Sequence, residues 1–226
     1  MSAASRDHSR MPTVAASPSL PILYRDDRLL AVDKPSGLLS VPGRGPDKQD
    51  CALSRVQLEH PSALVVHRLD MSTSGLLLFA LDRDMQRALG ALFERRRVSK
   101  RYIACVRGVP QPPTGDIDLP LSPDWPRRPR SRVDHDNGRS AHTGYRLLEQ
   151  IDQGRAARLE LTPTTGRSHQ LRVHLAALGH PILGDELYAD PDTQRMAPRL
   201  LLHAAYLAFE HPAGSAWLEL QSPAPF

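Results

Sequence analysis

Cysteine is scarce in this 226-residue chain, which contains only Cys51 and Cys105. Two cysteines are too few for a disulfide scaffold or a four-cysteine zinc site, and they suit a reducing cytosol. No apolar run approaches the roughly 18 residues that cross a bilayer, and the first twenty residues lack the apolar centre of a secretory signal. The sequence therefore predicts a cytoplasmic protein without a membrane span.

Common nucleotide-binding and nucleophile motifs are also missing. The chain has neither a GxxxxGKS/T loop nor a GxGxxG fingerprint, and it has no GxSxG elbow. Ten histidines make a metal site worth considering. However, His169 and His174 are five residues apart, off one face of a helix and on opposite faces of a strand. We therefore expect no metal and no cofactor.

Positive charge, in contrast, is abundant and clustered. Lys and Arg number 29 against 25 Asp and Glu, and the excess falls mainly in ERRRVSKR (94–101) and PRRPRSR (126–132). Such clusters attract phosphate backbones, with an affinity that falls as salt rises. A solvated helix end or loop would explain one cluster, but two favour a nucleic-acid partner.

The distribution of short apolar runs predicts an α+β fold. We expect a disordered tail over 1–20 and a single domain over 21–226. Within that domain, a hairpin is expected at 22–35, and Asp82 is the expected N-cap of a helix that ends at the arginines 95–97. Few helices and no regular strand–helix alternation favour a largely antiparallel sheet. Its further strands are expected at 64–66, 76–81, 101–108, 141–150, 156–162, 200–209 and 216–221.

Two other segments have distinctive patterns. The proline-rich residues 109–132 cannot hold a central strand throughout, which predicts a long, mostly irregular connection. Residues 164–181 have leucines at helical spacing, with Thr165 as a possible N-cap and Gly179 where a helix should end. We therefore expect a helix over most of the second segment.

The stretch VVHRLDMSTSG (65–75) carries more chemistry than a turn requires. Small hydroxyl residues and glycine suit a turn, but Arg68 and Asp70 are not needed for one. An Asp in a turn is most often a cap. A carboxylate beside an arginine, however, keeps its charge and can attack or accept a proton at neutral pH. Arg172 is the better partner, because Arg68 shares a face with Asp70 only in an extended segment.

The same stretch resembles a known family. HRLDMSTSG (67–75) is similar to the HRLDxxTSG motif of the RluA-family pseudouridine synthases, and GRSHQLRVH, KRYIA and RLLLHA resemble other signatures of that family. The resemblance runs from about Ile22 to the C-terminus. VDKPSGLLSVPGRG, LPLSPDWPRRPR and APRLLLHA are more similar to the A-type branch of the family, which modifies both a tRNA anticodon stem-loop and the rRNA of the large ribosomal subunit.

The resemblance implies a fold and a reaction. The fold would be the pseudouridine synthase catalytic fold, a bent, mostly antiparallel mixed sheet flanked by a few helices, here without an S4-like RNA-binding domain. The reaction breaks the bond from ribose C1′ to uracil N1 and rejoins the base through C5, without metal or cofactor. Asp70 would be the reactive carboxylate, adding covalently or removing a proton, with Arg172 holding it ionised and Tyr102 stacking on the uracil.

Substrate-binding residues are implied in the same way. Arg68 would fill the gap left by a flipped base, and Leu202 would pack against the reacting base. His67 is a neighbour of the site. We expect a monomer whose partner is structured RNA, either rRNA or a tRNA stem-loop.

Two other functions remain open at this point. A noncatalytic RNA-binding or ribosome-assembly protein would use the basic clusters equally well, but it would not need Asp70, Tyr102 and Arg172 together. A carboxylate-dependent nucleoside hydrolase would have little need for two arginine-rich segments.

Overall fold

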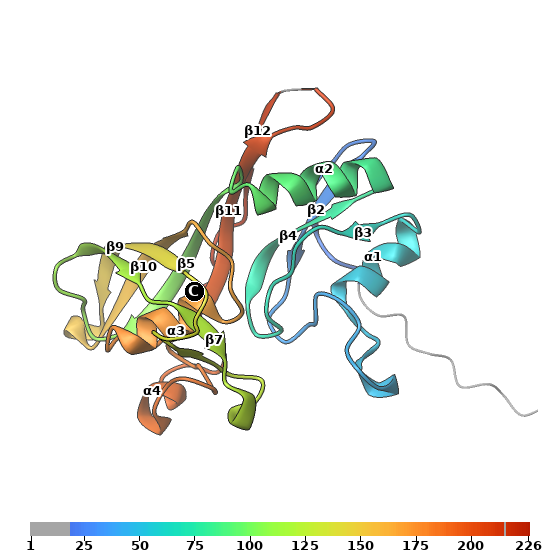
Figure 1. Ribbon diagram of the computed structural model, residues 1–226. Helices are drawn as coiled ribbons and strands as arrows, with labels where there is room; N and C mark the ends of the chain where they lie inside the picture. The colour runs from blue at the N-terminus through green and yellow to red at the C-terminus, as the bar shows by residue number, and fades with distance from the viewer. Residues whose placement is uncertain (1–18, 215) are drawn as a thin grey trace, which may run out of the picture.

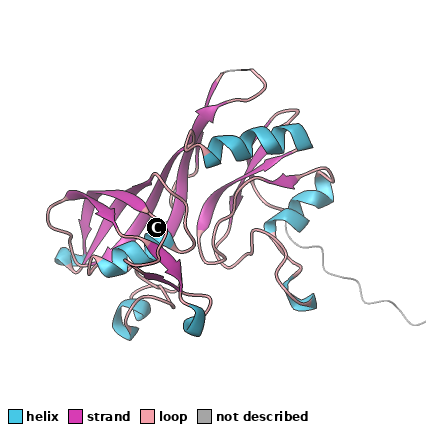
Figure 2. Cartoon of the chain, viewed as in Figure 1, coloured by secondary structure: helices cyan, strands magenta, loops and turns pink. Residues whose placement is uncertain are grey.

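The computed structural model describes residues 19–214 and 216–226. The tail expected at 1–20 therefore lies almost wholly outside the described residues. Figure 1 shows two lobes side by side, with β11 and β5 running between them, and Figure 2 shows helices packed on the outside of the strands. The α+β fold with a mostly antiparallel sheet is confirmed. None of the helices in the described part of the chain has the length and apolar character of a membrane span.

One large sheet extends through both lobes. Its strands are ordered β1-β2-β4-β11-β5-β10-β9-β6, with β12 beside β11 and β3 beside β4. The sheet consists of β1 (Ile22–Arg25), β2 (Leu29–Lys34), β3 (Leu64–Val65), β4 (Ser74–Ala80), β5 (Ser99–Arg107), β6 (Thr114–Asp118), β9 (His142–Ile151), β10 (Ala156–Pro163), β11 (Leu202–Glu210) and β12 (Trp217–Gln221). A separate two-stranded sheet is formed by β7 (Leu121–Pro123) and β8 (Ser131–Val133).

The two lobes meet where β4 runs parallel to β11. Only two residue pairs join these strands, His203 with Ser74 and Ala204 with Gly75. Gly75 has a φ of +109°, and a Cβ atom on it would lie 2.3 Å from the carbonyl oxygen of Ala204. The glycine of the TSG motif is therefore required by its backbone conformation and by the close approach of β11.

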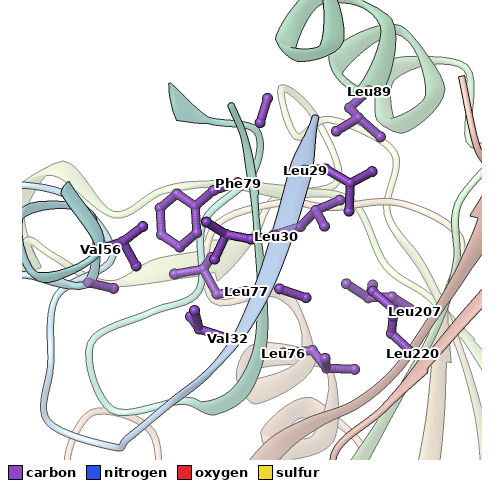
Figure 3. Close-up of a cluster of buried hydrophobic side chains, with 14 of the residues drawn as sticks. Leu29, Leu30, Val32, Val56, Leu76, Leu77, Phe79, Leu89, Leu207 and Leu220 are labelled. Carbon is purple, nitrogen blue, oxygen red and sulfur yellow. The ribbon is translucent and has the colours of Figure 1, made fainter. Parts of the chain in front are cut away.

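The larger core lies on both faces of β2 and β4, with α1 (Ala52–Glu59) against one face and α2 (Arg83–Glu94), β11 and β12 against the other (Figure 3). Every residue of β4 is buried. Both of its faces are therefore covered, which explains its continuous apolar sequence. Each fully buried leucine there contributes about 1.5–3 kcal/mol of hydrophobic stabilisation.

The helix α2 begins as the sequence predicts. The Asp82 carboxylate accepts a hydrogen bond from the Met85 backbone N–H at 2.8 Å, and Arg28 donates two hydrogen bonds to the same carboxylate. This cap satisfies one of the backbone donors left free at a helix start. The N-cap therefore also ties the helix to β2, which begins at Leu29.

A second core lies in the other lobe, between the strands β5, β10 and β9 and the helix α3 (Gln170–Ala177). The helix expected over 164–181 starts later than the sequence indicates. Thr165 does not cap it: its Oγ1 donates to the Gln170 side chain and accepts from the His142 N–H. His169, with a φ of +55°, stands directly before the helix in left-handed backbone. The expected end is correct, because Gly179 follows with a φ of +89°.

The connection over 109–132 is more regular than expected. It contains β6, which pairs with β9 at the sheet edge, and β7 with part of β8. The prediction of a mostly irregular segment was wrong because its prolines avoid β6 and occur in β7 only at the terminal Pro123, which an edge strand tolerates. A short helix, α4 (Pro191–Arg195), was not predicted. The single-turn helices are Pro46–Lys48, Trp125–Arg127 and Asp152–Gly154.

Candidate active site

A cleft of about 1160 Å³ lies at the junction of the lobes. One wall comes from the 67–72 loop before β4 and from 93–100, and the other comes from the 164–169 loop and α3. A smaller chamber of about 130 Å³ shares part of both walls and also reaches Thr73 and Leu202. The chamber therefore brings together segments from the first and last thirds of the chain.

The buried side chain of Lys34 stabilises the loop that carries Asp70. Its Nζ is wholly buried and donates hydrogen bonds to the carbonyl oxygens of Pro35, Leu38 and Met71 at 2.9, 2.7 and 3.1 Å. Ser40 adds two hydrogen bonds to the backbone of Leu69. Burial lowers the pKa of Lys34 to about 8, against the opposing effect of the Asp70 charge. The loop is therefore fixed on both sides of Asp70.

Asp70 faces two cationic or potentially cationic side chains across the cleft. Its Oδ2 lies 3.6 Å from Nη1 of Arg172 and 3.8 Å from Nε2 of His169. Its side chain is 29% exposed, and the Oδ1 atom makes no hydrogen bond with any residue of 19–214 or 216–226. One carboxylate oxygen is thus paired with donors while the other is free to meet a substrate.

Arg172 is brought to Asp70, as the sequence predicts, but its main partner is Asp185. Nε and Nη2 of Arg172 donate to the two oxygens of Asp185 at 2.8 and 2.6 Å, and both side chains are buried. The Asp185 carboxylate also accepts from the backbone N–H groups of Leu187 and Tyr188. The guanidinium is therefore aimed by a buried ion pair, and only its remaining edge reaches Asp70.

Tyr102 and Leu202 lie on the neighbouring strands β5 and β11, and both line the small chamber. Tyr102 pairs with Ala204 in the register between β5 and β11, and Leu202 pairs with Ala104. The Tyr102 ring packs against both cores, and its hydroxyl makes no hydrogen bond within the described ranges. Burial and the nearby Asp70 charge raise the pKa of Tyr102. The hydroxyl therefore stays protonated near neutral pH and can donate a proton rather than accept one.

The two remaining predicted residues differ in their surroundings. Arg68 is exposed on the cleft wall and makes no hydrogen bond or ion pair with the described residues. His67 accepts a hydrogen bond from the Leu78 backbone N–H at 3.0 Å and stacks on Phe93. Burial lowers the pKa of His67 to about 3, so the ring is neutral. Arg68 is therefore unpaired among the described residues, whereas the His67 ring is held by contacts with β4 and α2.

Sequence reasoning missed four residues of the site: Lys34, His169, Asp185 and Tyr188. The Tyr188 hydroxyl lies 2.7 Å from Nδ1 of His169. Lys34 and Asp185 are almost wholly buried, although charged residues beside Pro and Gly usually lie on exposed turns. No signal in the sequence pairs them with their distant partners, apart from the position of His169 within GRSHQLRVH.

Most of the charged side chains that line the cleft are cationic. Its acidic lining residues are Asp70, Glu94 and Glu186. The basic lining residues are Lys48, Arg68, Arg96, Lys100, Arg139, Arg167 and Arg172. Such a lining suits a polyanion. Within the described part of the chain, no group of three or more His, Cys, Asp and Glu side chains is arranged to hold a metal ion.

Comparisons with known proteins agree with this geometry. Residues 28–177 match the family model described as RNA pseudouridylate synthase. The chain is 50% identical over 209 residues to the dual-specificity RNA pseudouridine synthase RluA of Escherichia coli K12, covering 92% of this chain and 95% of that protein. It is 46% identical over 214 residues to the protein of the same name from Pasteurella multocida, covering 95% and 97%.

Solved structures give the same result. Human RNA pseudouridylate synthase domain containing 1 aligns with a TM-score of 0.78 and 29% identity, covering 96% of this chain and 87% of that one. Human RNA pseudouridylate synthase domain containing 4 aligns with a TM-score of 0.72 and 30% identity, covering 91% and 88%. Because the family model and the relatives together cover most of its length, the chain belongs to the RNA pseudouridylate synthase family, whose members isomerise uridine to pseudouridine in RNA.

Proposed function

We propose that this chain converts specific uridines to pseudouridine in both rRNA and tRNA, with Asp70 as the reactive carboxylate. The observation that carries the proposal is the free Oδ1 of Asp70 in a chamber shared with Tyr102 and Leu202, while Oδ2 faces Arg172 at 3.6 Å. The dual substrate is supported by the names of the relatives that are 46–50% identical to this chain.

The isomerisation needs no net change in protons or electrons. The bond between C1′ and N1 breaks, the uracil turns within the chamber, and C5 bonds to C1′ while its proton is lost and N1 gains one. A charged carboxylate can assist either by covalent addition or by removing a proton. In this proposal Arg172 faces Oδ2 at 3.6 Å and orients the Asp70 carboxylate toward the substrate.

The target uridine must leave its stack to reach Asp70. Flipping a base out costs a few kcal/mol. Arg68 is exposed beside Asp70 and lacks a partner within the described residues, so its guanidinium can occupy the vacated position. Tyr102 offers a ring on which the flipped uracil stacks, worth roughly 1–3 kcal/mol, and Leu202 packs against the base.

The surface beside the cleft suits the flanking RNA. Trp125 is 65% exposed, and the guanidinium of Arg128 lies 3.5 Å from the centre of its ring. Pro129 of the same segment lines the cleft. An exposed aromatic ring within a basic segment is a stacking platform for an unpaired base. We propose that residues 21–226 act as one catalytic domain and as a monomer in the cytoplasm, and that this domain itself selects the RNA.

Tritium release from RNA labelled at uracil C5 tests the proposal, because only reaction at C5 expels that hydrogen from an intact strand. The assay should be run with an rRNA fragment and with a tRNA anticodon stem-loop. We expect release from both with the wild-type chain and none above background with Asp70→Asn, which should still bind RNA. Full activity of Asp70→Asn would refute the role of Asp70, and release from only one RNA would refute the dual substrate.

A further inference from the structure

His169 and Tyr188 form a hydrogen-bonded pair behind Asp70. The Tyr188 hydroxyl lies 2.7 Å from Nδ1 of His169, and Nε2 of the same ring lies 3.8 Å from Oδ2 of Asp70. On its other side, the Tyr188 oxygen accepts a hydrogen bond from the Ser131 backbone N–H at 2.7 Å. A continuous series of contacts therefore leads from the backbone of β8 to the carboxylate.

These contacts fix where the imidazole proton lies. A backbone N–H can only donate, so the Tyr188 oxygen accepts from Ser131 and has one proton of its own to donate. Within residues 19–214 and 216–226, His169 Nδ1 is the acceptor that lies next to that hydroxyl. Burial lowers the pKa of His169, so its ring is neutral near pH 7. With Nδ1 accepting, the single ring proton is on Nε2, which faces Asp70.

We propose that Tyr188 is a positioning residue that acts through His169: it holds the Nε2–H tautomer, and that N–H then orients Asp70 by its Oδ2 atom. This inference rests on the proposed role of Asp70. At 3.8 Å the contact is longer than a hydrogen bond, and catalytic hydrogen bonds are often long before substrate binds. With Oδ2 held by His169 and Arg172, Oδ1 is directed at the uridine.

The surrounding structure supports this arrangement. Asp185 and Tyr188 lie in one short segment, and they hold Arg172 and His169 respectively, the two residues that face Oδ2. His169 adopts left-handed backbone with a φ of +55°, which a non-glycine residue adopts at a cost and which tends to occur at functional sites. The charges acting on His169 are those of Asp70, Arg172 and Asp185.

A double-mutant cycle tests the relay. Tyr188→Phe keeps the ring but removes the hydroxyl, and His169→Asn removes the imidazole with a residue that tolerates left-handed backbone. With tritium release as the assay, Tyr188→Phe should lower kcat about tenfold, the equivalent of about 1.4 kcal/mol, while KM stays unchanged. In the His169→Asn background the same change should have no further effect, because the relay is already broken.

Tyr145→Phe is the matched control. Tyr145 is buried in the second core, and its hydroxyl donates to the Pro112 carbonyl oxygen. Its removal should leave kcat unchanged. Nitrogen-15 NMR of the histidine side chains gives a direct readout. The signal that disappears in His169→Asn is thereby assigned to His169. In the wild type its chemical shifts should be those of the Nε2–H tautomer, and in Tyr188→Phe they should no longer be.

Four results would overturn the inference: full activity of Tyr188→Phe, an equal loss of kcat in the His169→Asn background, a loss of RNA affinity with kcat unchanged, or an Nδ1–H tautomer in the wild type. Asp70→Asn is assayed in parallel. If Asp70→Asn is inactive and Tyr188→Phe is fully active, only the relay is refuted. If Asp70→Asn is active, the proposed function fails instead.

Discussion

At the scale of single residues, the Asp70 site depends on buried charges that do not touch the substrate. Lys34 holds three backbone carbonyls around the Asp70 loop, and Asp185 holds Arg172. Each of these groups loses solvation on burial, and hydrogen bonds offset that loss only while the folded geometry persists. Rigidity of the site is therefore coupled to folding of the whole junction.

Two substitutions of Tyr102 distinguish its role in stacking from its role in proton donation. Tyr102→Phe keeps the ring, so binding of the flipped base and KM should change little. Loss of the hydroxyl, which is protonated near neutral pH, should lower kcat by about 10²-fold if it acts as a general acid. Tyr102→Leu should raise KM as well. Single-turnover and steady-state tritium release measure both, and a fully active Phe variant would contradict the role.

Lys34 should make stability depend on pH in the alkaline range. Its pKa falls from 10.5 to about 8 on folding, so between these values the unfolded chain binds more protons than the folded one. The free energy of unfolding contributed by this group therefore increases as pH rises from about 8 to 10.5, by on the order of 3 kcal/mol at most.

Denaturation of the wild type and Lys34→Met by urea between about pH 7 and 10.5 measures this effect. The variant should be less stable overall, because three buried carbonyls lose their donor. The stability difference in favour of the wild type should widen as pH rises. A constant difference across the range would show that Lys34 titrates normally in the folded chain.

At the scale of elements, the start of β4 is a closely constrained point of the sheet. A Cβ at Gly75 would meet the backbone of Ala204, and the residue also requires a positive φ. Gly75→Ala should therefore destabilise the fold by about 2 kcal/mol or more. Gly90 lies in α2 with open space around it, so Gly90→Ala is the control and should stabilise by up to about 1 kcal/mol. In thermal unfolding, we expect a lower Tm for Gly75→Ala and a higher Tm for Gly90→Ala than for the wild type. The same shift of Tm in both variants would contradict the constraint.

Local sequence predicted some elements well and others poorly. The start of α2 was predictable because its cap, Asp82, is adjacent in sequence. The start of α3 was not, because the side chain of Gln170 binds Thr165 and the Arg167 N–H and holds the preceding loop in place. Residue propensity predicts Thr165 as the N-cap. In the structure its hydroxyl instead accepts a hydrogen bond from the backbone N–H of His142 in β9.

At the scale of the whole molecule, the cationic cleft should control RNA affinity through salt. Arg139 is exposed and lines the cleft, whereas Arg83 is exposed at the start of α2 and does not line it. Arg139→Gln should reduce the slope of log affinity against log salt by roughly 1, the contribution of one phosphate contact. Arg83→Gln should leave the slope unchanged. Filter binding of a tRNA stem-loop over a range of salt concentrations measures the slope. An equal change of slope in both variants would contradict a specific role of the cleft, because it would show that only the net charge of the protein matters.

The sequence by itself predicted the fold class, the strands of the large sheet apart from β6, and part of the site, because periodicity, caps and the HRLDMSTSG motif are local properties of the chain. The sequence indicated Arg172 as the partner of Asp70, and tertiary structure decided the other pairings. Asp70 also faces His169 across the junction of β4 and β11, Arg172 takes Asp185 as its main partner, and Lys34 is buried against the loop. These pairings depend on how distant segments pack and on how far burial removes each group from water, and neither is encoded within a single stretch of sequence.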